Sequence, residues 1–210
     1  MNEKFFSLPA EKQQAILNAG YHVFARNSYK KSPMSEIAEA AGISKALLFH
    51  YFYNKKELYL YLLDTCAKVT NHALEESGCY EEDDLFEILF LGIQVKINIM
   101  RQYPDMGFFS IKAFYENDAE VAGEIQKRIQ DYSDFGINAQ HLKLDQKQFR
   151  PGIDLEMMYW DMYWASEGYL WEKFQQGDVS PDEMKKDFRR LVNHWKNVYQ
   201  HKGMEGHLDE

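Results

Sequence analysis

Apolar residues recur along this chain at intervals of three and four residues, the spacing that places side chains on one face of an α-helix. Ile16, Ala19, Val23 and Phe24 are the first to show it. No stretch has the two-residue alternation of a half-buried strand, and no repeat or long linker interrupts the pattern. We therefore predict an all-α protein of about nine helices, at residues 9–27, 33–41, 44–51, 55–75, 84–101, 104–116, 118–142, 153–176 and 181–201.

Polar residues and one glycine mark the ends of the short helices near the N-terminus. Ser32 is the predicted N-cap of the second helix, because a serine hydroxyl can accept a hydrogen bond from a free amide of the first turn. Gly42 follows that helix and can turn the chain sharply. Asn54 and Glu57 have the spacing of a capping box, which predicts the start of the fourth helix.

The predicted helix at residues 153–176 has two apolar faces. One stripe contains Met157, Trp160, Trp164, Gly168 and Trp171, and the other contains Leu155, Met158, Tyr159, Met162 and Tyr163. A helix with two apolar faces needs two packing partners. The second partner is either another copy of the chain or a further part of the same domain, and the pattern leaves both open.

The net charge of −9 speaks at first against a nucleic-acid partner, since binding to a polyanion depends largely on neutralising phosphates. The charge is unevenly distributed, however. Residues 1–62 contain eight Lys and Arg against five Asp and Glu, whereas the remaining residues contain 16 against 28. A basic N-terminal segment on an otherwise acidic chain is compatible with binding to nucleic acid.

A short helix, a turn with glycine and a second short helix have the geometry of a helix-turn-helix, whose second helix enters the major groove of DNA. The apolar residues spaced to hold the two helices together are Ile37, Ala38, Ala41, Ile43, Leu48 and Phe52. The residues left on the outside of the second helix are Lys45, Ala46, Leu47, Phe49, His50 and Tyr51. Lys45 can bind a phosphate or a guanine edge, and Lys55 at the start of the next helix is a candidate phosphate ligand.

The segment from Ser7 to Tyr59 resembles the DNA-binding domain of the tetracycline-repressor (TetR) family of bacterial regulators. The resemblance rests on EIAEAAGISKALLFHYFYNKKEL, in which Ala-Gly-Ile-Ser-Lys is followed by an aromatic-His-Tyr-Phe run and by Asn-Lys-Lys-Glu-Leu. It implies an all-α homodimeric repressor that binds a palindromic operator. It also implies that the last two helices form the dimer interface and that the middle helices enclose a cavity for a small-molecule effector.

The resemblance places DNA contacts on the outer side of the second short helix. Two residues depart from the family pattern, because Phe49 stands where tyrosine is usual and Ala46 where glycine is common. Together with the residues that begin these helices, the candidate DNA-binding residues are Ser32, Ser44, Lys45, Ala46, Leu47, Phe49, His50, Tyr51 and Lys55.

The rest of the chain is rich in aromatic residues, which favours an apolar pocket with a few polar groups. The candidate ligand-binding residues are Phe90, Phe108, Phe109, Tyr115, Tyr132, Phe135, Tyr159, Trp160 and Tyr163. The candidate dimer-interface residues are Trp164, Trp171, Phe188, Leu191 and Trp195. We predict a DNA-binding domain at 1–54, a ligand-binding and dimerisation domain at 55–203 and a flexible tail at 204–210. The acidic body further suggests a cationic, lipophilic effector.

Other classes of protein find less support in the sequence. The chain has no Glu-x-x-His pair and no two histidines four residues apart, so we expect no metal site, no cofactor and no enzyme activity. It has neither a signal-peptide core nor a run of about 20 apolar residues, which predicts a cytoplasmic protein without a membrane partner. A dimeric interaction protein that keeps the fold without specific DNA binding remains the alternative.

Overall fold

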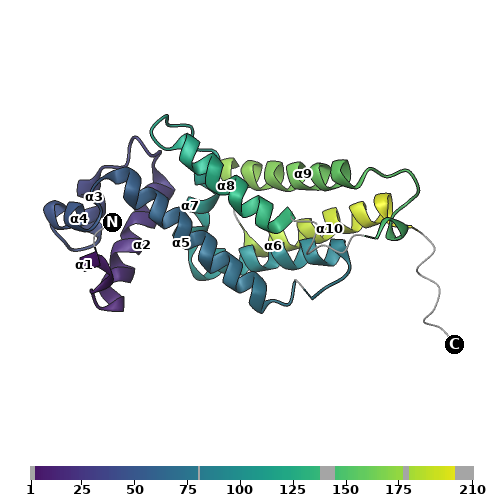
Figure 1. Ribbon diagram of the computed structural model, residues 1–210, viewed down its shortest axis with the longest axis horizontal. Coiled ribbons are helices and arrows are strands. Elements are labelled where there is room, and N and C mark those ends of the chain that lie inside the picture. The colour runs from purple at the N-terminus through teal and green to yellow at the C-terminus, as the bar shows by residue number, and fades with distance from the viewer. Residues whose placement is uncertain (1–2, 80, 138–144, 177–179, 202–210) are drawn as a thin grey trace. The chain divides into compact units, whose positions relative to one another are not determined.

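The computed structural model describes residues 3–79, 81–137, 145–176 and 180–201, without the side chains of 131–137, 174 and 176 (Figure 1). Its helices are α1 (Glu3–Phe6), α2 (Ala10–Arg26), α3 (Met34–Ala40), α4 (Lys45–Tyr51), α5 (Lys55–Glu76), α6 (Leu85–Gln102), α7 (Pro104–Phe114), α8 (Ala122–Ile137), α9 (Leu155–Gln176) and α10 (Pro181–Tyr199), with a 3-10 turn at Gln146–Gln148. Within these residues there is no strand, and Phe149 and Gln200 form an isolated bridge. The all-α prediction is confirmed. The predicted helix end at residue 142 lies outside the described residues.

Helix α1 has no counterpart among the predicted helices. It is four residues long, too short for a helical period to be visible in the sequence. Its Phe5 is fully buried, with ring centroids of Phe52 and Tyr61 at 4.9 and 5.8 Å. The start of the chain therefore packs directly behind the end of α4.

The contacts divide the chain into two compact units. The first unit combines Met1–Asn71 with Ile99–Phe135, and the second combines His72–Asn98 with Gly136–Glu210. Helices α5 and α6 thus each contribute to both units. The predicted boundary at residues 54 and 55 divides the chain by function rather than by contacts and stays a prediction. The predicted tail at 204–210 lies outside the described residues.

An aromatic cluster forms the core of the first unit. The ring of Phe109 on α7 lies 5.4 Å from Tyr21 on α2 and 5.0 Å from Tyr59 on α5, measured between centroids. The Tyr21 hydroxyl donates to the backbone carbonyl of Leu62 at 2.9 Å. At Gly20, an added Cβ would lie 2.7 Å from a methyl carbon of Leu62, so a larger residue there would displace the end of that side chain.

Helices α6, α9 and α10 share the core of the second unit. Its buried residues are Leu85, Phe86, Phe90, Phe149, Met158, Met162, Val192 and Trp195. Two ion pairs link α10 to the start of α6, because Arg189 contacts Glu87 at 2.8 Å and Lys196 contacts Asp84, the residue before α6, at 2.8 Å. None of the helices described is long and apolar enough to span a bilayer.

Candidate nucleic-acid interface

Helices α3 and α4 form a helix-turn-helix around Gly42. This glycine has φ of +67°, in the left-handed region that favours glycine, and its amide donates to the carbonyl of Glu39 at 3.0 Å. The next amide, of Ile43, donates to the carbonyl of Ala38 at 3.0 Å. Ile37 and Leu48 are fully buried where the two helices face each other. The turn predicted at Gly42 is confirmed, and it sets the direction of α4.

Ser44 caps the helix that would enter the groove. Its Oγ accepts a hydrogen bond from the amide of Leu47 at 3.1 Å, which satisfies one of the free amides of the first turn. The side chain remains exposed next to Lys45. A predicted DNA contact by Ser44 is compatible with this position, since the hydroxyl has a further lone pair and a proton.

Ser32 behaves differently from the prediction. The residue at the N-cap of α3 is Pro33, which makes no side-chain hydrogen bond, and the Ser32 hydroxyl donates instead to the carbonyl of Ser28 at 2.9 Å. The predicted cap is therefore wrong. Ser32 is also fully buried, which argues against its predicted contact with DNA.

The outer side of α4 carries five exposed residues. They are Lys45, Ala46, Leu47, Phe49 and His50, all of them candidates from the sequence. The Lys45 ammonium lies 5.9 Å from the centroid of the Phe49 ring. Tyr51 is only 7% exposed and its ring packs edge-on against Phe5 at 6.1 Å, which favours a packing role for it.

The start of α5 is capped as the sequence predicts. The Asn54 side chain accepts from the amide of Glu57 at 2.8 Å. The Glu57 carboxylate accepts in return from the amide of Tyr53 at 2.9 Å, one residue earlier than in the usual capping box. Lys55 therefore lies in the first turn of a helix whose N-terminus is capped by side-chain hydrogen bonds.

Lys55 is engaged within the protein itself. Its ammonium donates to the carbonyl of Tyr29 at 2.9 Å and lies 4.3 Å from the centroid of the Tyr29 ring. The amide of Tyr29 donates to the Glu116 carboxylate, just beyond α7, at 2.8 Å. The turn between α2 and α3 is thus held from one side by α5 and from the other by the end of α7. Sequence reasoning missed Tyr29 and Glu116, because no local pattern links residues so far apart in the chain.

A second polar contact ties α7 to α2. Asp105 accepts from Arg26 at 2.6 Å and contacts His22 Nδ1 at 3.0 Å. Burial alone would raise the pKa of the Asp105 carboxyl, but the hydrogen bonds from Arg26 and His22 outweigh burial and hold that pKa below its usual range. The carboxylate form is therefore favoured, and α7 keeps a fixed position beside α2.

The predicted ligand-binding residues do not form one cluster within either unit. Phe90 belongs to the core of the second unit, where the Arg189 guanidinium lies 3.4 Å from the centroid of its ring, and Phe109 belongs to the core of the first. The half-buried candidates are Phe108, Tyr115, Tyr159, Trp160 and Tyr163, from both units. The side chains of Tyr132 and Phe135 lie outside the described part. The ligand assignment stays a prediction.

The predicted dimer residues fall into two groups. Trp164 is 58% exposed, and Trp171 and Leu191 are half-buried. Phe188 and Trp195 are buried within the chain, which argues against contacts between copies at these two positions. Met157 on α9 is also 55% exposed. It shares the predicted stripe with Trp164, so the sequence contained the signal that would have selected it.

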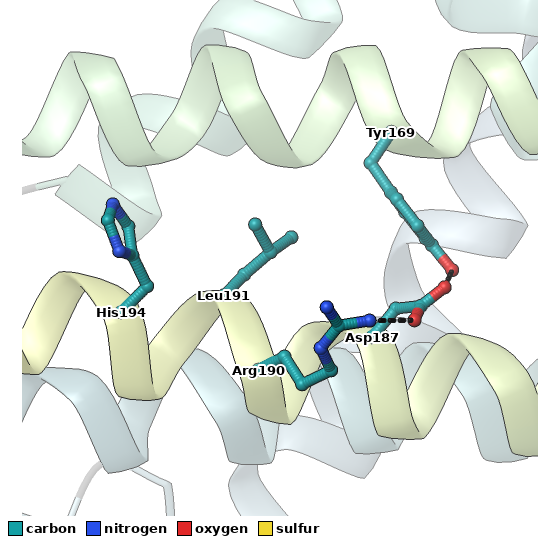
Figure 2. Close-up of a pocket in the computed structure, with 5 residues that line it drawn as sticks. All are labelled: Tyr169, Asp187, Arg190, Leu191 and His194. Atoms are coloured by element: carbon teal, nitrogen blue, oxygen red, sulfur yellow. Dashed lines mark hydrogen bonds and ion pairs between the residues drawn. The ribbon is translucent and has the colours of Figure 1, made fainter.

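A hollow of about 410 Å³ lies between α9 and α10. It is lined by Tyr169, Asp187, Arg190, Leu191 and His194 (Figure 2). The Tyr169 hydroxyl reaches from α9 and donates to the Asp187 carboxylate at 2.8 Å, while Arg190 contacts the same carboxylate at 3.8 Å. Burial and the bond to Asp187 raise the pKa of Tyr169, so this hydroxyl stays a donor. Within the described residues, no three His, Cys, Asp or Glu side chains are placed to hold a metal ion.

Comparison with known proteins decides the family. Residues 16–62, from α2 into α5, match the model of the family described as bacterial regulatory proteins, tetR family, and this segment contains the whole helix-turn-helix. The helix-turn-helix segment of this chain belongs to the tetR family. The family resemblance seen in the sequence of the helix-turn-helix is thereby confirmed.

Relatives of known role extend the match along the chain. One is the biofilm operon icaADBC HTH-type negative transcriptional regulator IcaR of Staphylococcus aureus strain Newman, 22% identical over 195 residues, which cover 88% of this chain and 96% of that protein. Another is the HTH-type transcriptional regulator RutR of Escherichia coli K12, 30% identical over 94 residues, 44% of this chain and 43% of that one. These relatives are regulators and not enzymes. This chain is likewise a DNA-binding transcriptional regulator, and the prediction that it is not an enzyme agrees with the role of its relatives.

Solved structures show the same fold. A TetR family regulator from Chloroflexus aurantiacus J-10-FL superposes with a TM-score of 0.64 at 21% identity and covers 96% of this chain and 99% of its own. NalD, the secondary repressor of the MexAB-OprM multidrug efflux pump in Pseudomonas aeruginosa, superposes with a TM-score of 0.68 at 16% identity, over 91% of this chain and 98% of its own. The tetR fold therefore extends well beyond the helix-turn-helix.

Proposed function

We propose that this tetR-family chain acts as a homodimeric repressor that binds a palindromic operator and leaves it when a small molecule binds. The observation that carries the proposal is the capped, exposed helix α4, whose outer side presents Lys45 and His50 on a well-packed helix-turn-helix. A helix of this kind in the major groove contacts base edges with its N-terminal residues. IcaR, which is similar in sequence over most of this chain, is named as a negative regulator, and NalD, which shares its fold, is named as a repressor.

The dimeric part of the proposal is supported by the exposed apolar residues of the second unit. Met157 and Trp164 on α9 and Val198 on α10 are large, apolar and well exposed in the single chain. Large apolar side chains this exposed are often covered by a partner. In a two-fold dimer the same patch serves both copies, and two α4 helices then meet two half-sites of a pseudo-palindrome.

The effector part is supported by one carboxyl group among aromatic residues. Burial raises the pKa of Glu167, which lies on α9 with Tyr159 and Tyr163, by more than the positive charge of Lys96 lowers it. A cation next to this group would favour its charged form, as expected for the cationic, lipophilic effector that the acidic composition suggests. The four tryptophans all lie on α9 and α10, so titration with cationic dyes can be followed by their fluorescence. If none of the dyes quenches the tryptophan fluorescence in a saturable way, the hypothesis of a cationic effector is refuted.

The experiment that tests the proposal selects sites from genomic DNA fragments with the purified protein. The affinity for the enriched site is then compared with that for scrambled DNA at about 150 mM salt. We expect a palindromic site preferred by roughly 10³-fold or more, as is typical of specific regulators. Lys45→Ala should lower the affinity, and Lys185→Ala, which removes an exposed lysine of α10, should leave it unchanged. Weak binding without sequence preference would instead support the interaction protein named as the alternative.

A further inference from the structure

The composition of α4 limits how this helix can read DNA. Its sequence is KALLFHY, and all seven residues are described. It contains no Arg, Asn, Gln, Asp or Glu, the residue types that most often recognise guanine, adenine or cytosine through hydrogen bonds to the base edge. Lys45 and His50 are its exposed polar side chains, since Tyr51 is buried. Direct hydrogen-bond reading by this helix is therefore confined to two side chains.

The exposed apolar residues of α4 are arranged on two sides of its outer face. Leu48 and Tyr51 point into the core, so the helical period places Ala46 in the middle of the outer face, with His50 beside it on the same side as Leu47. Leu47 lies on one flank of this centre. Phe49 lies on the other flank, beside Lys45 one turn earlier. Leu47 and Phe49 are each 36% exposed, which leaves apolar surface on both flanks that DNA can cover.

Local contacts fix the backbone at Leu47 and place a cation beside the Phe49 ring. The amide of Leu47 is bound by the Ser44 hydroxyl, which fixes the first turn of the helix where base contacts are made. The Lys45 ammonium lies 5.9 Å from the centroid of the Phe49 ring, so a cation and an apolar ring share this flank of the helix. The methyl side chain of Ala46, between Leu47 and Phe49, allows the helix to come close to the bases.

We propose, on the basis of the operator binding proposed above, that Leu47 and Phe49 recognise the operator through thymine methyl groups. The C5-methyl of thymine is the apolar group that a base pair presents in the major groove. Leu47 and Phe49 each cover such a methyl on their own flank of α4. Each half-site accordingly contains at least two thymines that specify binding, separated by the base pairs under Ala46. Lys45 and His50 add contacts to phosphates or to a guanine.

The experiment removes the methyl groups and nothing else. The duplex with the highest affinity is selected from random DNA, and each thymine of that duplex is then replaced in turn by deoxyuridine. Burying one methyl contributes about fourfold in affinity, so the dissociation constant should rise about fourfold at two positions or more in each half-site. In Leu47→Ala the sensitivity at one of these positions should disappear, and in Phe49→Ala the sensitivity at the other.

Phe6→Ala is the matched control, because it truncates an exposed phenylalanine of α1 and should keep the full sensitivity to deoxyuridine. Thermal unfolding of the three variants checks that the helix-turn-helix is intact. Equal affinity for the thymine and deoxyuridine duplexes at every position would overturn the inference. So would a sensitivity that both α4 variants retain in full, since other residues would then recognise the methyls. If selection enriches no sequence at all, the proposed operator binding fails, and this inference fails with it.

Discussion

The Lys55 ammonium donates a hydrogen bond of 2.9 Å to the backbone carbonyl of Tyr29 and lies 4.3 Å from the centroid of the same residue's ring. This contact connects the first turn of α5 to the turn that precedes α3. The position of Lys55 at the start of a helix and the family resemblance both predict that it binds a DNA phosphate. The structure adds a positioning role, because the turn it holds leads directly into the helix-turn-helix.

Lys55→Ala tests which role dominates. We expect the variant to lose about 1 kcal/mol of stability with the hydrogen bond, and to bind DNA more weakly because the turn before α3 loosens. The slope of log affinity against log salt should stay unchanged. A slope lower by about one unit would show instead that Lys55 neutralises a phosphate. Lys56→Ala, one residue further along α5, is the matched control for loss of a lysine.

Glu116 holds the other side of the same turn. Replacing it with alanine leaves the amide of Tyr29, a fully buried residue, without its acceptor, which should cost about 1–2 kcal/mol in the free energy of unfolding. Glu116→Gln keeps an oxygen that can accept and should recover most of the stability and the DNA affinity. Urea unfolding measures the first quantity and fluorescence anisotropy with labelled operator the second. Equal behaviour of the two variants would show that the hydrogen bond to Tyr29 does not matter.

The Asp105 contact predicts a dependence on pH. The folded-state pKa of Asp105 lies below its usual value, so the carboxylate stabilises the folded protein above the usual pKa of about 3.9 and loses this effect as the pH falls through the lowered pKa. Asp105→Asn should therefore be less stable at neutral pH, by about 0.5 kcal/mol because the ion pair is partly exposed. The difference from the natural chain should shrink below about pH 4. Thermal unfolding across pH 3–7 measures it, and a constant difference would contradict this explanation.

Several features of the fold could be predicted because their signals are local. The turn at Gly42, the Asn54 cap and the exposed side of α4 follow from residues a few positions apart. Contacts between distant segments could not be predicted in this way. Arg26 and Asp105 are 79 residues apart, and nothing near either residue indicates the other. Helix α1 was missed because four residues are too few to show a period.

The stripe on α10 shows a different limit of sequence reasoning. An amphipathic face is apolar whether it packs on its own chain or on a second copy. Phe188 and Trp195 were therefore predicted at an interface, although they are buried in their own chain. Trp164 lay in an equally apolar stripe of α9 and is exposed. Only the position of the neighbouring helices distinguishes the two cases.

Trp164 gives the direct test of the proposed dimer. Trp164→Glu should weaken self-association by about 2 kcal/mol, roughly 30-fold in the dissociation constant, because a buried tryptophan at an interface often contributes this much. Trp164→Phe keeps an apolar ring and should largely restore the dimer. Sedimentation velocity over a range of concentrations measures both variants. Unchanged association of Trp164→Glu would remove Trp164 from the interface.

The central claim is that two copies of α4 read two half-sites of one operator. Hydroxyl-radical footprinting on the selected site tests it most directly. We expect two symmetrical protected patches whose centres lie one helical turn of DNA apart, about 34–36 Å, or a multiple of this distance. Lys45→Ala should weaken both patches equally. A single protected patch, or uniform protection along the fragment, would contradict the claim.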